Sequence, residues 1–122
     1  MQYFWVALGG GIGASLRHGL GQWSARALGD GFPVGTLAAN ILGSLLMGLL
    51  AGWLVGREAE AARLLLGVGL LGGFTTFSAF SLDSIRLLEA GRWGAAAGYV
   101  GGSVALSLVA LLLGLLLARA CA

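Results

Sequence analysis

Hydroxyl groups recur on one face of the last apolar stretch of the chain. Tyr99, Ser103 and Ser107 are spaced four residues apart, which places them in line on a helix. A lone serine in a membrane helix usually bonds back to a carbonyl of its own helix. Two serines aligned with a tyrosine are less easily explained in this way and favour a different interpretation, a ladder of hydroxyl donors.

A second polar group lies in the middle of an uncharged stretch. Asn40 is a large amide that is unfavourable to bury without hydrogen-bond partners. It either bonds to a neighbouring helix or belongs to a polar pathway, and periodicity alone favours neither.

Small or polar residues recur every four positions around Asn40: Thr36, Asn40, Ser44, Gly48, Gly52 and Gly56. Such spacing lets helices approach closely in lipid, and this packing role is the one we predict for the three glycines. Gly94, Gly98 and Gly102 predict a similar packing face near the C-terminus.

The segment GGFTTFSAF, from Gly72 to Phe80, has glycines and hydroxyls at the centre of another apolar run. Consecutive glycines are poor helix formers, and irregular backbone at membrane depth is tolerated where it is buried in protein or lines a cavity. We therefore predict two half-helices with an unwound turn over Gly72 to Thr76. The competing interpretation is a continuous helix whose glycines only allow tight packing.

Phe77 and Phe80 lie three residues apart and share a helical face. Membrane phenylalanines mostly face lipid or fill the core, but an aromatic ring also has a positive edge. A ring edge beside a narrow polar path would favour an anion without binding it too tightly to leave.

The elements that position these groups are membrane helices. Hydrophobic residues make up 58% of the 122 residues and charged residues 10%, too few charges for a water-facing surface. We predict one domain, residues 1–122, with four spans near 2–25, 32–56, 64–82 and 93–118. The single Cys121 excludes an intrachain disulfide and a multi-cysteine metal site.

Arginines are balanced between the two ends of these spans. The side with both termini holds Arg57, Arg63 and Arg119, and the opposite side holds Arg26, Arg86 and Arg92. The positive-inside rule orients proteins by an imbalance that is missing here. Either Arg17 or the N-terminus fixes one orientation, or copies insert both ways up and pair as an antiparallel dual-topology homodimer. We favour the second interpretation.

The residue inventory excludes several classes of protein. No nucleophile and base can be paired, so no enzyme is predicted, and no basic stripe suggests nucleic acid. A small four-helix proton-coupled multidrug exporter needs a carboxylate within a span, and the predicted spans contain none. A non-transporting assembly subunit would explain the glycines but not the aligned hydroxyls.

Three motifs resemble the Fluc/CrcB family of fluoride channels: GGGIGASLRHG, GTLAANILGSLLMG and GGFTTFSAF. The resemblance covers essentially the whole chain, and TTFS combined with GTLxxN is its most specific part. It implies a homodimer in the cytoplasmic (inner) membrane of a microbe, with two pores that export fluoride passively. His18, Ala79 and Leu45 stand where we expect Tyr, Thr and Phe in that family.

The resemblance also implies roles for individual residues. The fluoride pathway would comprise Asn40, Phe77, Phe80, Tyr99, Ser103 and Ser107. Arg17 would lie near a pore vestibule. Backbone carbonyls of Gly72 and Thr75 would hold a structural Na⁺ at the dimer interface.

Overall fold

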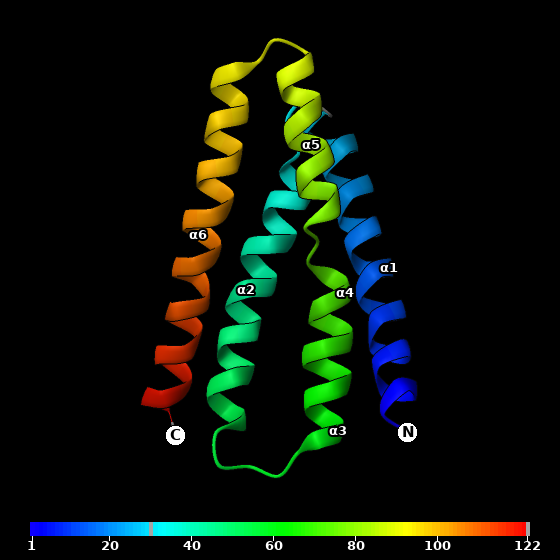
Figure 1. Cartoon of the computed structure of the whole chain (residues 1–122), viewed down its shortest axis with the longest axis vertical. Coiled ribbons are helices and arrows are strands. Elements are labelled where there is room, and N and C mark those ends of the chain that lie inside the picture. Colours follow the sequence, from blue (N-terminus) through cyan, green and yellow to red (C-terminus); the bar gives the residue numbers. More distant parts are fainter. Residues whose placement is uncertain (30, 122) are drawn as a thin grey trace.

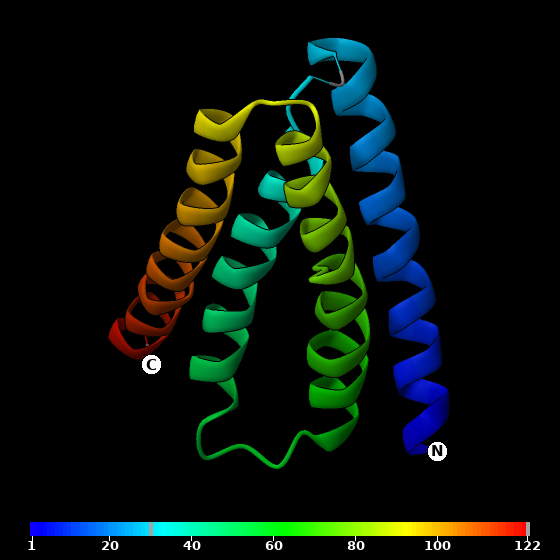
Figure 2. The same cartoon turned by 45° about the horizontal axis from the view of Figure 1, so that its top comes forward.

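The protein is a bundle of four antiparallel helical rods (Figures 1 and 2). A computed structural model describes residues 1–29 and 31–121, and all regular structure in that part of the chain is helical. The first two rods are α1 (Gln2–Leu28) and α2 (Val34–Leu54), and the last is α6 (Trp93–Ala120). The third rod consists of α3 (Glu60–Ala62), η1 (Arg63–Leu71), α4 (Gly72–Phe74) and α5 (Ser78–Glu89). Both termini lie at one end of the bundle, as predicted (Figure 1).

The described residues contain three units that are long and apolar enough to cross a membrane. These are α2, the third rod taken as Glu60–Glu89, and α6. The protein is therefore an all-helical membrane protein. Helix α1 has 27 residues, but it includes Arg17, His18 and Arg26 and is less apolar. Its crossing of the membrane stays a prediction.

Helices continue past several charges that were expected to lie in connections. Asp83 was placed at the start of a polar connection, but α5 extends to Glu89. The turn that follows uses Gly91 at φ 77, a conformation that favours glycine. Charged side chains do not end a helix near a membrane surface, because they can reach toward water.

Glycines bring α2 and α6 into backbone contact. A Cβ on Gly48 would meet the Leu111 carbonyl, and a Cβ on Gly52 would lie 2.5 Å from Cβ of Ala118. These two packing predictions are confirmed. Gly56 is different, because it lies beyond the end of α2 at φ 75 and makes no such contact.

The prediction that Gly94, Gly98 and Gly102 form a packing face on α6 is wrong within this chain. A Cβ on Gly94, Gly98 or Gly102 would meet nothing within 4 Å. Helix α6 instead contacts α2 through Gly114, whose Cβ would meet the Leu45 carbonyl. Spacing identifies glycines on one face but does not say which face meets a neighbour.

Helix α1 packs against the first half of the third rod in the same way. A Cβ on Gly13 would lie 2.8 Å from the amide nitrogen of Phe74, and a Cβ on Gly73 would lie 2.6 Å from the Gly10 carbonyl. The glycines of the third rod therefore serve tight packing, which is the interpretation that competed with a break.

The third rod is also broken, but later than predicted. Gly72 and Gly73 are helical, while Thr75 is extended at φ −83 and ψ 158. The break thus covers Thr75 to Phe77, between α4 and α5. The segment before α4, η1, is a π-helix, a form often found near functional sites.

Candidate functional site

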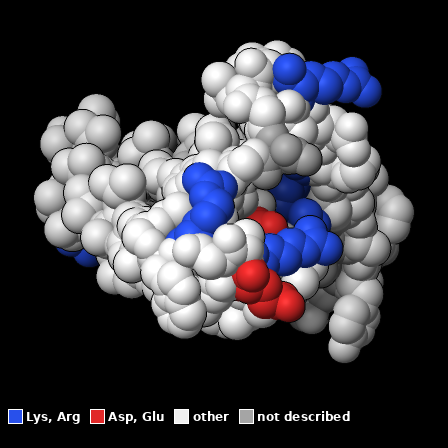
Figure 3. Space-filling view, turned by 90° about the horizontal axis from the view of Figure 1, so that it is seen from above, with Lys and Arg blue, Asp and Glu red and all other residues white. Residues whose placement is uncertain are grey.

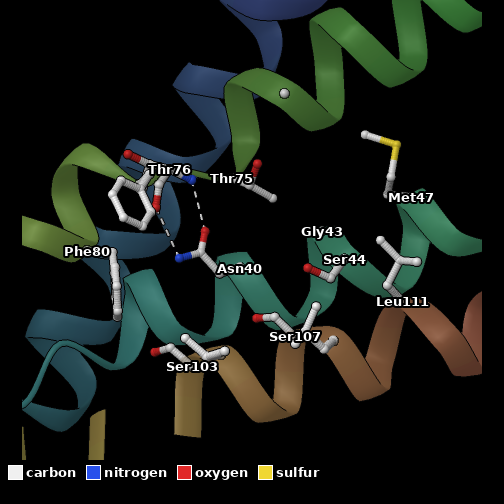
Figure 4. Close-up of a pocket in the computed structure, with 14 residues that line it drawn as sticks. Asn40, Gly43, Ser44, Met47, Thr75, Thr76, Phe80, Ser103, Ser107 and Leu111 are labelled. Carbon is white, nitrogen blue, oxygen red and sulfur yellow. Dashed lines mark hydrogen bonds between the residues drawn. The ribbon is translucent and has the colours of Figure 1, made fainter. Parts of the chain in front are cut away.

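Asn40 of α2 makes a two-point pairing with the broken backbone. Its Nδ2 donates to the Thr76 carbonyl at 3.1 Å, and its Oδ1 accepts from the Thr76 N–H at 2.9 Å. Figure 4 shows both bonds as dashed lines. The amide side chain therefore replaces partners that a continuous helix would have supplied. Of the two roles left open for Asn40, the interhelical bond is the one observed directly.

Threonine hydroxyls satisfy backbone groups on either side of the break. Thr75 Oγ1 donates to the Leu71 carbonyl at 3.0 Å, in the last turn before the break. Thr76 Oγ1 accepts from the Ala79 N–H at 3.2 Å, at the start of α5. A hydroxyl bound to an amide three residues later is typical of a helix N-cap. Thr76 was not predicted as a site residue. Its place two residues before the start of α5 could have identified it as a helix cap.

A pocket of about 490 Å³ lies beside the break, between α2, the third rod and α6 (Figure 4). It brings together seven residues that were predicted for the site: Asn40, Gly72, Thr75, Phe77, Phe80, Ser103 and Ser107. The prediction missed the other lining residues: Gly43, Ser44, Met47, Thr76, Val104, Leu108 and Leu111. Ser44 and Met47 lie four and seven residues after Asn40, so the face of α2 could have identified them.

The two serines of α6 are buried toward this pocket. Within the described residues, the buried hydroxyls of Ser103 and Ser107 have no hydrogen-bond partner. Ser15, Ser81 and Ser84 behave differently, since each donates to the backbone carbonyl four residues earlier in the chain. Because buried polar groups are normally paired, these two hydroxyls are available to a ligand in the pocket.

Aromatic rings continue from the pocket into the protein. The centroids of Phe77 and Phe80 are 5.6 Å apart, and those of Phe80 and Tyr99 are 5.2 Å apart. The ring of Phe32 meets Tyr99 edge-on at 5.5 Å. Phe77 is 77% exposed, whereas Tyr99 is 0% exposed. Both phenylalanines line the pocket, but Tyr99 does not.

Tyr99 makes its polar contact outside the pocket. Its hydroxyl donates to Oδ2 of Asp83 on α5 at 3.3 Å. Asp83 belongs to the third rod, taken as Glu60–Glu89, but it lies one residue beyond the predicted span of 64–82. Spans free of carboxylates stay a prediction, and so does the argument from them against a proton-coupled exporter.

Arg17 reaches the other side of the break from α1. Its Nε donates to the Gly73 carbonyl at 3.3 Å, and its side chain is partly buried. It does not line the pocket. Gly72 and Thr75, whose carbonyls were predicted to hold a cation, both line the pocket; Gly72 begins α4 and Thr75 directly follows it.

These features define an all-helical membrane protein with a pocket at a helix break, in which hydroxyl and amide groups lie among apolar side chains. Residues 4–115 match a family model described as "CrcB-like protein, Camphor Resistance (CrcB)". The chain is 56% identical over 117 residues to "Fluoride-specific ion channel FluC" of Phenylobacterium zucineum, covering 93% of this chain and 92% of that protein. It is 50% identical over 121 residues to "Fluoride-specific ion channel FluC 2" of Nitrobacter hamburgensis, covering 98% of each chain. The chain belongs to the CrcB family.

Proposed function

We propose that the protein is a fluoride-selective ion channel, in keeping with the names of its relatives. The observation that carries the proposal is a pocket lined both by two unpartnered hydroxyls, those of Ser103 and Ser107, and by the rings of Phe77 and Phe80. Hydroxyl donors and positive ring edges suit an anion. No arginine lines this pocket, so the ion meets no full positive charge there and is free to leave.

The transport direction follows from general chemistry. Fluoride enters a cell as neutral HF and ionises in the less acidic cytoplasm, where the anion is trapped. A negative-inside membrane potential then drives it out, at about 2.3 kcal/mol per charge per 100 mV. The protein would act in the cytoplasmic (inner) membrane. Passive flow makes and breaks no covalent bond, so no enzyme activity is proposed.

Reconstitution in liposomes tests this function. Vesicles loaded with potassium fluoride and given a potassium ionophore should release fluoride when they contain the purified protein. Matched vesicles loaded with potassium chloride should release little chloride, and protein-free vesicles control for leakage. A fluoride flux no higher than that of protein-free vesicles, or an equal chloride flux, would contradict the proposal.

We further propose that two copies pair as an antiparallel homodimer. One copy leaves Phe77 77% exposed beside a partly open pocket, and a second copy packed there would cover the ring and close the pocket. The ends of the rods carry equal numbers of arginines, including Arg26 and Arg119 in the last turns of α1 and α6. Figure 3 shows one such end, where acidic side chains lie among the basic ones.

Labelling from one face of the membrane should detect both orientations. The variant Glu58→Cys/Cys121→Ala carries one cysteine, in the loop between α2 and α3. An impermeant maleimide added to intact cells should modify about half of the protein, and cell lysis should expose the rest. Modification of nearly all or none before lysis would indicate one fixed orientation.

Na⁺ is proposed as a structural ion of the dimer. The residues fit this ion, since backbone carbonyls near a helix break carry partial negative charge, and Gly72 and Thr75, on either side of α4, both line the pocket. The ion would supply positive charge that holds broken helices together. Melting of the purified dimer should occur at higher temperature in sodium chloride than in N-methylglucamine chloride, and equal melting temperatures would remove the ion from the proposal.

A further inference from the structure

The contact between Arg17 and the broken helix follows from the spacing of the first helix. Gly9, Gly13 and Arg17 are four residues apart and share one face of α1. A Cβ on Gly9 would lie 2.7 Å from the amide nitrogen of Leu70, so this face of α1 touches the backbone of η1. One turn beyond the glycines, the same face delivers the arginine to the end of α4.

The carbonyl that Arg17 contacts needs a partner. Gly73 lies in the last turn of α4, where the carbonyls find no N–H donor within the helix. The extended Thr75 directs the chain away, so the carbonyl faces α1 instead. An N–H donor from a neighbouring helix satisfies such a carbonyl, whether or not the donor is charged.

We propose that Arg17 is a positioning residue that caps α4 and fixes the break. The bond from Nε to the Gly73 carbonyl, 3.3 Å long, holds the α1 side of the break, while Asn40 holds Thr76 on the α2 side. Together these two contacts fix the position of Phe77 in the break between α4 and α5. This role differs from that of a vestibule charge, because it requires an N–H at one place rather than a positive charge near the pore.

Two substitutions of Arg17 separate the need for an N–H donor at the position of Nε from the need for a positive charge. In Arg17→Gln, Nε2 stands the same number of bonds from Cα as Nε of arginine, so the donor is kept and the charge is lost. In Arg17→Met, the terminal methyl group stands at that point. The donor and the charge are then both lost, while the side chain keeps nearly the length of glutamine. Ser15→Ala is the control, because Ser15 lies on α1 and bonds only to Gly11 of the same helix.

Amide hydrogen exchange of residues 74–79 gives a readout that does not depend on transport. We expect Arg17→Met to exchange about tenfold faster there, since a buried carbonyl loses a hydrogen bond. Arg17→Gln and Ser15→Ala should keep slow exchange. Equal exchange in wild type and Arg17→Met would overturn the proposal.

Fluoride flux gives the second readout, and this part rests on the proposed channel function. The flux of Arg17→Gln should exceed that of Arg17→Met by about tenfold. Equal loss in both, with unchanged exchange, would assign Arg17 to a vestibule charge instead. If wild type carries no fluoride, the channel proposal fails while the exchange comparison still decides the role of Arg17.

A further variant serves if Arg17→Met does not fold. Arg17→Lys keeps the charge but places a methylene group where Nε stood. A positioning role then predicts slower exchange in Arg17→Gln than in Arg17→Lys, and a vestibule charge predicts higher flux in Arg17→Lys. Faster exchange in Arg17→Gln than in Arg17→Lys would overturn the proposal.

Discussion

Replacing Asn40 by leucine is expected to lower fluoride flux by more than about tenfold. Leucine has the same branched shape but removes both bonds to Thr76, at 2.9 and 3.1 Å. Each buried backbone group left unpaired costs about 1–3 kcal/mol, and about 1.4 kcal/mol corresponds to a factor of ten. The break therefore rearranges to pair these groups elsewhere, which displaces Phe77 and Phe80 from the pocket.

The measurement is fluoride efflux from liposomes, combined with amide exchange at Thr76. Leu42→Ala is the control: Leu42 lies on the same helix, is exposed and does not line the pocket. Its flux should stay within about twofold of wild type. Wild-type flux in Asn40→Leu would mean that the pairing with Thr76 is not needed for conduction.

The break shows how far the sequence predicts this site. Glycines and threonines at the centre of an apolar run predicted an interruption, and one is present. Its position was set three residues too early, because Gly72 and Gly73 were treated as helix breakers. In the structure they remain helical and let α1 approach, with Gly73 against Gly10. A glycine pair weakens a helix but does not decide where it ends.

Partners from other helices decide where the break falls. Asn40 precedes Thr76 by 36 residues, and Arg17 precedes Gly73 by 56 residues. Local propensity contains no information about such contacts. The sequence showed that each polar group needed a partner, but only the packing of α1 and α2 against the third rod shows which group it finds.

The hydroxyl face of α6 was predicted more completely, and only its outer member differs. Ser103 and Ser107 line the pocket, while Tyr99 turns to Asp83. Tyr99 and Ser107 are about two turns apart on the helix, so one pocket need not reach all three residues. The carboxylate that binds Tyr99 was assigned to a connection, and so this pairing was missed.

The second large effect is expected at the two phenylalanines. Phe80→Ile and Phe77→Ile should each lower fluoride flux, with the larger loss, more than about tenfold, at Phe80. The ring of Phe80 lies between those of Phe77 and Tyr99, with centroid distances of 5.6 and 5.2 Å. Isoleucine fills much of the space but has no positive ring edge for an anion. Loss of ring contacts beyond burial adds about 0.5–1.5 kcal/mol.

A matched ring outside the pocket separates this effect from general destabilisation. Phe4 lies on α1, 54% exposed and against Trp5, so Phe4→Ile should change fluoride flux by less than about twofold. Size-exclusion chromatography before reconstitution would show whether each variant keeps the assembly of wild type. Loss of flux with intact assembly points to the ring edge itself. Unchanged flux in both Phe77→Ile and Phe80→Ile would place the ion path away from these rings, leaving Ser103 and Ser107 as the groups that meet the ion.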